Sequence, residues 1–319
     1  ARKSLSQAYT SACEALLSHL GIEPSKVAGV GVHGQTLRHR PDLGFTYQTI
    51  DPALIASRLG IHVVSDFRSK DIALGGQGVP LVPGFHEAWI RGSGREGEEA
   101  VLNLGGFSNL KVLKASGEPH QVIGGDCGPA NVWMDHVMRQ EFGRQFDTAG
   151  DVARQGQVNP TLFKILHSHP FFAKSWPKST GRDDFSMDVL DQALDAAVRE
   201  QGCPISPIDL MRTLLELCAR TVVDCLKPYS IDALWVCGGG AFNLFLLDRI
   251  QALFNEGSHG LVQPVQVKTT EDLGLPVMAV EAAAFAWLAA QFLNRSPGNC
   301  VGVTGASRPA ILGSITYFD

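Results

Sequence analysis

The stretch VLNLGGFSNLKVL, residues 101–113, decides the fold class. Two runs of apolar and polar residues, 101–104 and 109–113, flank Gly105-Gly106, which is the pattern of a β-hairpin. Residues 121–123 predict a third strand directly after it. The hairpin therefore opens a unit whose sheet contains antiparallel strands.

Helices and strands alternate after this hairpin. From Asn131 apolar residues recur at helical spacing, and we expect a helical insertion over about 131–205, broken by the polar run PFFAKSWPKSTGR. Ser206-Pro207 predicts the start of a long helix that runs to about residue 226. A strand (ALWVC, 233–237), a turn (GGGAFN, 238–243) and a helix (244–254) follow, and residues 265–269 and 277–293 repeat the step from strand to helix.

The same alternation precedes the hairpin. A helix is expected to end at Gly21, a strand at 27–32, and a helix to begin at Asp51-Pro52 and end at Gly60 before the strand IHVV. These patterns predict an α/β protein with mixed sheets flanked by helices in two lobes. The expected lobes are 1–100 and 101–319, and the C-terminal helix and tail could return to the first lobe.

The composition limits the classes of partner that the protein is expected to bind. The chain has 319 residues, a formal net charge of −5 and a pI near 6.1, so no broad basic field exists for nucleic acid. The most apolar stretch, 279–293, is interrupted by Glu281 and Gln291, so no membrane partner is expected. Seven scattered cysteines without C-x-x-C spacing favour a reducing cytoplasm, and neither cysteine nor histidine spacing predicts a protein-only metal site.

Glycines at strand ends are the first candidates for a binding site. NLGGFSN (103–109) and CGGGAFN (237–243) let the backbone approach an anion, and two such loops favour an ATP cleft over two simple turns. In GGDCGPAN (124–131), Asp126 stands between a strand and a helix, where it is either a helix cap or a base that acts on a nucleophile. GVGVHG (29–34) matches the dinucleotide motif, but no helical pattern follows it, which argues against that function.

Polar loops are the second group of candidates. SDFRSKD (65–71) and PKSTGRD (177–183) suit sugar hydroxyls and a carboxylate, although solvated salt-bridged loops are an equal alternative. We expect Glu281, within the apolar run VEAAAFAWLAA, to face a cleft because burial of an unpaired carboxylate is costly. His33, in HGQT directly after a strand, is the one histidine kept as a ligand-binding candidate.

Taken together, GVHGQTLRHRP, DPALIASRLGIHVVSDFR, GGQGVPLVP, NLGGFSNL, GGDCGPANVWMD, PKSTGRDDF, CGGGAFN, EAAAFAWLA and PGNCVGVTGASR resemble the anhydro-N-acetylmuramic acid kinase family. The motifs span residues 27 to about 313 in family order. The resemblance implies a two-lobed, actin-like ATPase (ribonuclease H-like) fold. It also implies ATP-dependent conversion of 1,6-anhydro-N-acetylmuramic acid and water to N-acetylmuramic acid 6-phosphate in peptidoglycan recycling, with Mg²⁺ accompanying the nucleotide.

The resemblance also implies roles for individual residues. Asp126 would be the base toward the attacking water. The sugar would be bound by His33, Gln35, Asp66, Arg68, Lys178, Arg182 and Glu281. The nucleotide would be bound by Gly105, Gly106, Asn109, Gly128, Asn131, Gly238, Gly239, Gly240 and Asn243. We further expect a homodimer.

In one respect the sequence departs from the family pattern. The family has a glycine-, serine- and threonine-rich phosphate loop in its first strand hairpin, and this sequence starts beyond that position. The first lobe is therefore expected to be incomplete, and a chain without the loop is expected to be catalytically weakened. Two alternatives remain open at this point: an inert sugar- or muropeptide-binding module, and another sugar kinase of the same superfamily.

Overall fold

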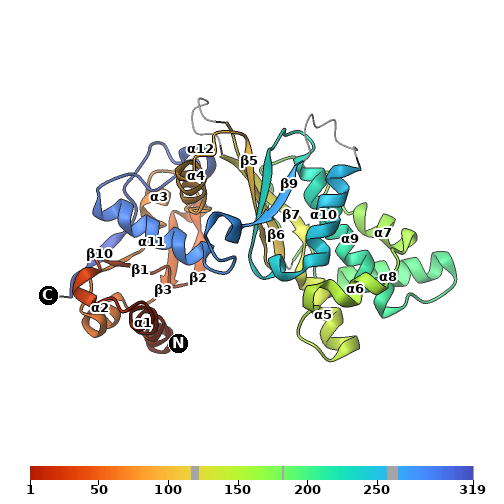
Figure 1. Ribbon diagram of the computed structural model, residues 1–319, viewed down its shortest axis with the longest axis horizontal. Helices are drawn as coiled ribbons and strands as arrows, with labels where there is room; N and C mark the ends of the chain where they lie inside the picture. Colours follow the sequence, from red (N-terminus) through yellow and green to blue (C-terminus); the bar gives the residue numbers. More distant parts are fainter. Residues whose placement is uncertain (116–121, 182, 257–264, 319) are drawn as a thin grey trace. The chain divides into compact units, whose positions relative to one another are not determined.

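The computed structural model describes residues 1–115, 122–181, 183–256 and 265–318 (Figure 1). Helix α1 (Arg2–Leu20) ends at Gly21, whose φ of 63° lies in the left-handed region. Helix α2 (Pro52–Leu59) begins where the Asp51 carboxylate accepts a hydrogen bond from the Leu54 amide at 3.2 Å, and it ends at Gly60. Both helix boundaries predicted from capping residues are confirmed.

The chain divides into two compact units. The first unit contains residues 1–95 and the segment from Glu281 onward, so the division falls after Arg95 and the C-terminal segment groups with the N-terminal one. Its three-stranded sheet has the order β1-β4-β10, with β1 (Val30–Gly31) parallel and β10 (Ser314–Thr316) antiparallel to β4 (Val63–Ser65). The remaining elements of this unit are the hairpin of β2 (Gln35–Arg40) and β3 (Phe45–Thr49) and the helices α3 (Ser69–Ala73), α4 (Pro83–Gly92), α11 (Val280–Leu293) and α12 (Val301–Thr304).

The second unit, Glu96–Val280, is built on a five-stranded sheet of order β7-β6-β5-β8-β9. The predicted hairpin is confirmed as β5 (Glu99–Leu104) and β6 (Phe107–Leu113), and β7 (Val122–Pro129) extends it antiparallel at one edge. Strands β8 (Ala233–Cys237) and β9 (Gln266–Thr269) add to the other side of β5 in parallel. The sheet is therefore mixed, as the sequence predicted.

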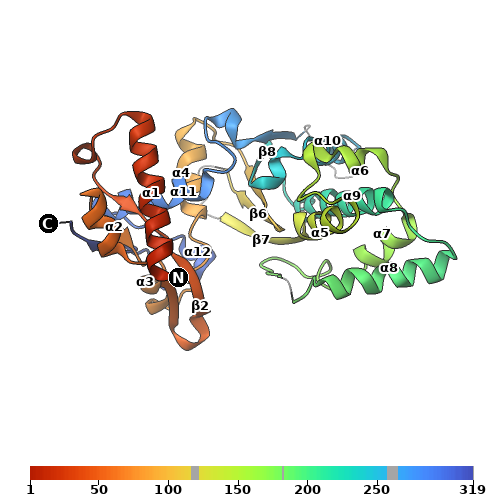
Figure 2. The same cartoon turned by 90° about the horizontal axis from the view of Figure 1, so that it is seen from below.

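The helices of the second unit gather on one face of this sheet, as Figures 1 and 2 show. Alternate strand residues such as Leu102, Leu110 and Val112 are fully buried in one core with the helices. The opposite face carries Asn103, Asn109 and Lys111, which is the face on which the candidate site lies. The helices are α5 (Asn131–Phe142), α6 (Asp151–Gln155), α7 (Pro160–His167), α8 (Met187–Gln201), α9 (Pro207–Leu226) and α10 (Leu244–Asn255).

Short elements account for the main differences from the predicted boundaries. The strand expected at 27–32 is reduced to Val30–Gly31 because residues 24–26 form a 3₁₀ turn that begins with a proline. The segment after the GVGVHG motif is strand β2, so no helix follows, and the structural context of a dinucleotide site is absent there. The 3₁₀ turns are Pro24–Lys26, Pro41–Leu43, Thr148–Gly150, Gly239–Phe242 and Thr270–Leu273. No helix among the described residues is both long and apolar enough to span a bilayer.

Candidate active site

A lateral row of residues crosses the second unit's sheet at the end where its glycine loops lie. Asn109 of β6 stands opposite Asp126 of β7 on one side and Asn103 of β5 on the other, and Asn103 stands opposite Cys237 of β8. Strand alternation sends the Asn103 and Asn109 side chains away from the helices. The four positions Asp126, Asn109, Asn103 and Cys237 therefore form one row, directly before the glycines.

The Asp126 carboxylate is held by both of its oxygens. Oδ1 accepts a hydrogen bond from Asn109 Nδ2 at 2.7 Å, and Oδ2 accepts one from the Thr180 amide at 2.8 Å. The Asp126 amide donates to the Lys178 carbonyl at 2.9 Å. The side chain is half-buried, so it is fixed in orientation while part of it faces solvent. The Asp126 side chain is no helix cap, because the N-cap residue of α5 is Ala130.

Lys111 is a functional candidate that sequence reasoning missed. It is only 8% exposed, and its ammonium donates to Asn109 Oδ1. Burial lowers the pKa of Lys111, and the nearby Cys237 and Asp126 groups act in the opposite direction. The sequence did contain a signal for Lys111. In a strand, residues two apart point to the same side, so Lys111 must lie on the same face of the sheet as Asn109. The side-chain amide of Asn109 therefore joins Lys111 to Asp126.

The glycine loops pack together beside this row. The Asn131 and Val132 amides donate to the carbonyls of Gly105 and Gly106 at 3.2 and 3.0 Å, and Asn131 Nδ2 donates to Leu104 at 3.3 Å. A Cβ at Gly240 would lie 2.5 Å from the Leu104 Cβ, so the GGG turn fits against β5 only as glycine. The predicted loops 105–106 and 238–240 and residue 131 therefore come together.

Open space adjoins these loops. A Cβ at Gly239 would meet no atom within 4 Å, and at Gly106 the nearest would be 3.8 Å away. By contrast, a Cβ at Gly128 would lie 2.7 Å from the Phe172 ring, and the Gly128 carbonyl accepts from Ser108 Oγ, so this glycine serves packing. Bare backbone beside open space fits a phosphate group, because amides can then approach an anion without obstruction.

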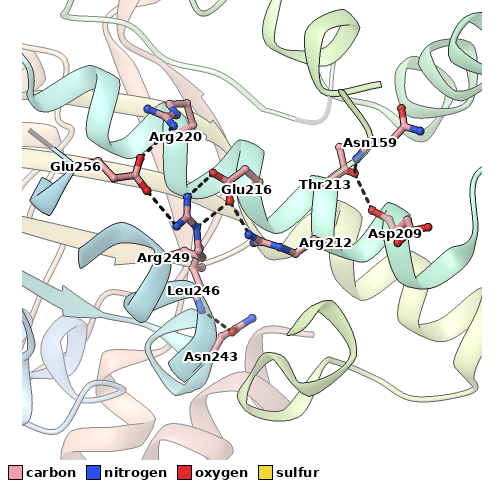
Figure 3. A network of polar contacts seen from close by, with 10 residues as sticks. All are labelled: Asn159, Asp209, Arg212, Thr213, Glu216, Arg220, Asn243, Leu246, Arg249 and Glu256. Atoms are coloured by element: carbon pink, nitrogen blue, oxygen red, sulfur yellow. Dashed lines mark hydrogen bonds and ion pairs between the residues drawn. The ribbon is translucent and has the colours of Figure 1, made fainter. Parts of the chain in front are cut away.

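Asn243 has a structural task. It is 7% exposed, and its side-chain oxygen accepts from the Leu246 amide at 3.0 Å, which caps α10. Figure 3 shows it beside an ion network that joins α9 and α10. Glu216 accepts from Arg249 at 2.8 and 2.9 Å and pairs with Arg212 at 3.1 Å. The network fixes the helix that follows the GGG turn.

In the first unit, His33 and Arg68 form a second polar cluster. Arg68 donates to His33 Nε2 through Nε at 3.1 Å and Nη2 at 2.7 Å, and its Nη1 donates to the Gly78 carbonyl at 2.6 Å. Burial, and then the Arg68 charge, lower the pKa of His33 to about 4. The imidazole is therefore a neutral acceptor that orients the guanidinium.

His33 makes stability depend on pH. The unfolded imidazole protonates below about pH 6.5, whereas the native one resists protonation until about pH 4, so acid favours the unfolded state in this window. We expect the free energy of unfolding to fall as pH is lowered from 6.5 to 4, and to fall less steeply in His33→Gln, which keeps an acceptor for Arg68. Urea unfolding at several pH values measures both slopes. Equal slopes would contradict the neutral state of His33.

Asp71, another residue that sequence reasoning missed, supports this cluster. Its carboxylate is fully buried and accepts from the Gly78 amide at 2.8 Å, from Asn299 Nδ2 at 2.9 Å and from Thr304 Oγ1 at 2.8 Å. A Cβ at Gly76 would lie 2.2 Å from Asp71 Oδ2. Asp71 thus joins the GGQG loop to the PGNCVGVTG segment and fixes the carbonyl that receives Arg68.

We expect Asp71→Asn to lower the free energy of unfolding by about 1–3 kcal/mol. The new side-chain amide would point an N–H at one of the donors whose hydrogen bond the Asp71 carboxylate now accepts, so that donor would lose its acceptor. Chemical denaturation measures the change. Asp42→Asn is the matched control, since Asp42 is exposed and forms its ion pair with Arg40 two residues away. A loss no larger than that of the control would show that the Asp71 hydrogen bonds contribute little.

Other predicted sugar-site residues are placed differently. Gln35 is exposed, and exposed Asp66 accepts from its neighbour Ser69 Oγ at 2.6 Å, as in a solvated turn. Glu281, which was expected to face a cleft, is exposed in the first turn of α11. Its charge nevertheless opposes the lowering of the Arg68 pKa by burial, so the two groups are near one another.

The PKSTGR loop contacts Asp126 through backbone groups, whereas the ammonium group of its lysine points elsewhere. Lys178 Nζ donates to the carbonyls of Phe171 and Phe172 at 3.3 and 3.4 Å and lies 4.5 Å from the Phe171 ring centre. The contacts with Asp126 come from the Lys178 carbonyl and the Thr180 amide. Arg182 lies outside the described residues.

An oriented carboxylate beside two glycine loops, at one end of a mixed sheet, defines an α/β phosphotransferase. The sequence model of the anhydro-N-acetylmuramic acid kinase family matches residues 2–318, and the chain belongs to that family. A curated anhydro-N-acetylmuramic acid kinase of Paraburkholderia xenovorans (strain LB400) is 44% identical, over 99% of this chain and 81% of that protein. The one of Pseudomonas paraeruginosa (strain DSM 24068 / PA7) is also 44% identical, over 94% of this chain and 78% of that protein.

Similarity to solved structures is distant. The ROK hexokinase of Thermus thermophilus has a TM-score of 0.39 and 13% identity, covering 90% of this chain and 87% of the hexokinase. Likeness at this level does not bear on the function, which rests on the family and on the site.

Proposed function

We propose that the chain is the ATP-dependent kinase that converts 1,6-anhydro-N-acetylmuramic acid and water to N-acetylmuramic acid 6-phosphate. The observation that carries the proposal is the Asp126 carboxylate, held by Asn109 and Thr180 beside the two glycine loops. ATP with Mg²⁺, when bound, supplies the γ-phosphoryl group. Family membership supports the substrate.

In this proposal Asp126 is the general base. It takes a proton from the water that attacks the anomeric carbon, and the bond from that carbon to O6 breaks. O6 then forms a bond to the γ-phosphorus of ATP while the bond from that phosphorus to the β–γ bridging oxygen breaks, so that ADP leaves. The two hydrogen bonds to Asp126 support this role, because they hold the carboxylate in one orientation before the substrate arrives. Lys111, which lies on the same face of the sheet and donates to Asn109, is proposed to supply a positive charge that stabilises the negative charge developing during transfer.

The glycine loops are proposed to bind the nucleotide phosphates through backbone. Gly239 and Gly106 support this, since each borders open space. Arg68 is proposed to bind the sugar's carboxylate. Its guanidinium has five N–H donors, the bonds to His33 and Gly78 leave donors free for a ligand, and neutral His33 fixes its plane. Gln35, Asp66 and Glu281 are exposed enough to contact a ligand, as is expected of residues in a sugar site.

A product assay tests the proposal. The chain is incubated with the anhydro-sugar, ATP and Mg²⁺, and mass spectrometry follows N-acetylmuramic acid 6-phosphate. We expect product only when ATP is present. Calorimetric binding of the anhydro-sugar without product would support the inert binding module instead, and phosphorylation of a different sugar would support another kinase of the superfamily.

We also propose that the reaction serves peptidoglycan recycling in the cytoplasm. All seven cysteines are free in the structure, which supports a reducing compartment. Fractionation of the source cells tests this location. The homodimer stays a prediction that light scattering can check.

A further inference from the structure

The segment 171–180 wraps around the edge of β7 and reaches both faces of the second unit's sheet. On the open face the Thr180 amide donates to Asp126. On the helix face Phe171 is 1% exposed within the core, and Phe172 and Trp176 pack against it. The Lys178 carbonyl is fixed to β7 between them, and a Cβ at Gly125 would lie 2.6 Å from it. One short segment therefore connects Asp126 with the opposite side of the sheet.

A pocket of about 590 Å³ lies on the helix face, between this segment and the C-terminal end of α9. Several aromatic rings line it. Trp176 stacks with Tyr229 at 5.8 Å between ring centres, and His167 stacks with Phe172 at 5.8 Å. Small-molecule sites usually measure roughly 300–1,000 Å³, and ring faces suit a ligand that is itself flat or cyclic.

The charge in this pocket is positive. Lys174 and Lys178 line it, and its one acidic lining residue, Asp224, is paired with His167 at 3.0 Å and with Lys227 at 2.7 Å. Cys225 opens onto the same space. A hydrogen bond with Cys127 and the charge of Lys178 lower the pKa of the Cys225 thiol, although burial opposes them. An anionic group is the ligand chemistry that such surroundings favour.

We propose that this pocket is a second binding site, which takes a small ring-bearing anion and acts on Asp126 through residues 176–180. The ring would lie against Trp176 and Tyr229, and the anionic group would pair with Lys174. A ligand that shifts the segment also shifts the Lys178 carbonyl and the Thr180 amide, both of which hold Asp126. The proposed binding of this ligand does not depend on the proposed kinase function. The proposed effect of the ligand on Asp126 does depend on that function.

Two probes test binding without any turnover. 8-Anilinonaphthalene-1-sulfonate represents aromatic acids and is followed by its fluorescence, and N-acetylglucosamine 6-phosphate represents sugar phosphates and is followed by calorimetry. We expect saturable 1:1 binding of at least one probe, and a Kd at least tenfold higher in Lys174→Ala and in Tyr229→Ala. Lys164→Ala, which removes an exposed lysine outside the pocket, should leave the Kd unchanged. Binding of neither probe, or binding that neither substitution weakens, would overturn the site.

Thiol alkylation locates the bound probe. Iodoacetamide is expected to modify Cys225 more slowly when the probe is present, and to modify exposed Cys203 at an unchanged rate, as read by peptide mass spectrometry. Protection of neither cysteine, or of both equally, would overturn the location. The link to Asp126 is then measured as a change in kcat on adding the probe, which Lys174→Ala should abolish. An unchanged kcat in an active enzyme would remove the link and leave the binding site standing.

Discussion

Asp126→Asn is expected to lower kcat about 10³-fold, within the roughly 10²–10⁴-fold range that a general base contributes. The amide cannot take a proton from water, and it keeps nearly the shape of the carboxylate. Because the glycine loops are untouched, ATP affinity should stay that of the parent protein. Mass spectrometry of the product gives kcat, and calorimetry gives the nucleotide affinity.

The control for this variant is Asp191→Asn, which makes the same change at an exposed position on α8. An amide at 126 also turns one donor toward Asn109 or Thr180, so the unfolding transition of the variant must be recorded. Turnover near the parent value in a folded variant would eliminate Asp126 as the base. Loss of both turnover and ATP binding would instead indicate a disturbed site.

Glu216→Ala is expected to lower the free energy of unfolding of the second unit by about 3–5 kcal/mol, because it removes the buried carboxylate that pairs with Arg212 and leaves Arg249 with the exposed Glu256 as its ion-pair partner. Glu216 is 9% exposed at its side chain, and its arginine partners Arg212 and Arg249 are 15% and 20% exposed. Figure 3 shows that both arginines converge on this one carboxylate. Urea denaturation followed by circular dichroism measures the loss.

Glu256 supplies the matched control. It also contacts Arg249, at 3.4 Å, but it is 49% exposed, so Glu256→Ala should cost roughly 0–1 kcal/mol. Equal losses in the two variants would show that burial does not decide the strength of this network. A loss only in Glu216→Ala would establish that α9 and α10 are joined mainly by the buried carboxylate.

The sequence predicted helices well where a capping residue marks the helix end. Asp51 and Gly60 mark the bounds of α2, and Ser206 caps α9 (Pro207–Leu226) by accepting from the Asp209 amide, as expected. The hairpin of β2 and β3 was not predicted, because its residues are mostly polar and exposed and give no apolar alternation.

The sequence singled out the glycine loops and Asp126 as candidates, but it did not predict the groups that hold the Asp126 carboxylate. Thr180 and Asp126 are far apart in sequence, and only the fold brings the Thr180 amide to the carboxylate. Lys178 was predicted from charge to bind substrate, yet its ammonium contacts the Phe171 and Phe172 carbonyls on the helix face. Glu281 was expected to face a cleft because burial of its charge among apolar neighbours would be costly, and it lies exposed at the start of α11.

The first unit is assembled from two separated pieces of chain, because β10 (Ser314–Thr316) pairs with β4 (Val63–Ser65). During synthesis on the ribosome, residues 96–280 emerge as one continuous stretch and can fold while translation continues. The sheet of β1 and β4, by contrast, must wait for its last strand. Nascent chains arrested before Ser314 should therefore protect the second unit from protease and leave the first one open to cleavage.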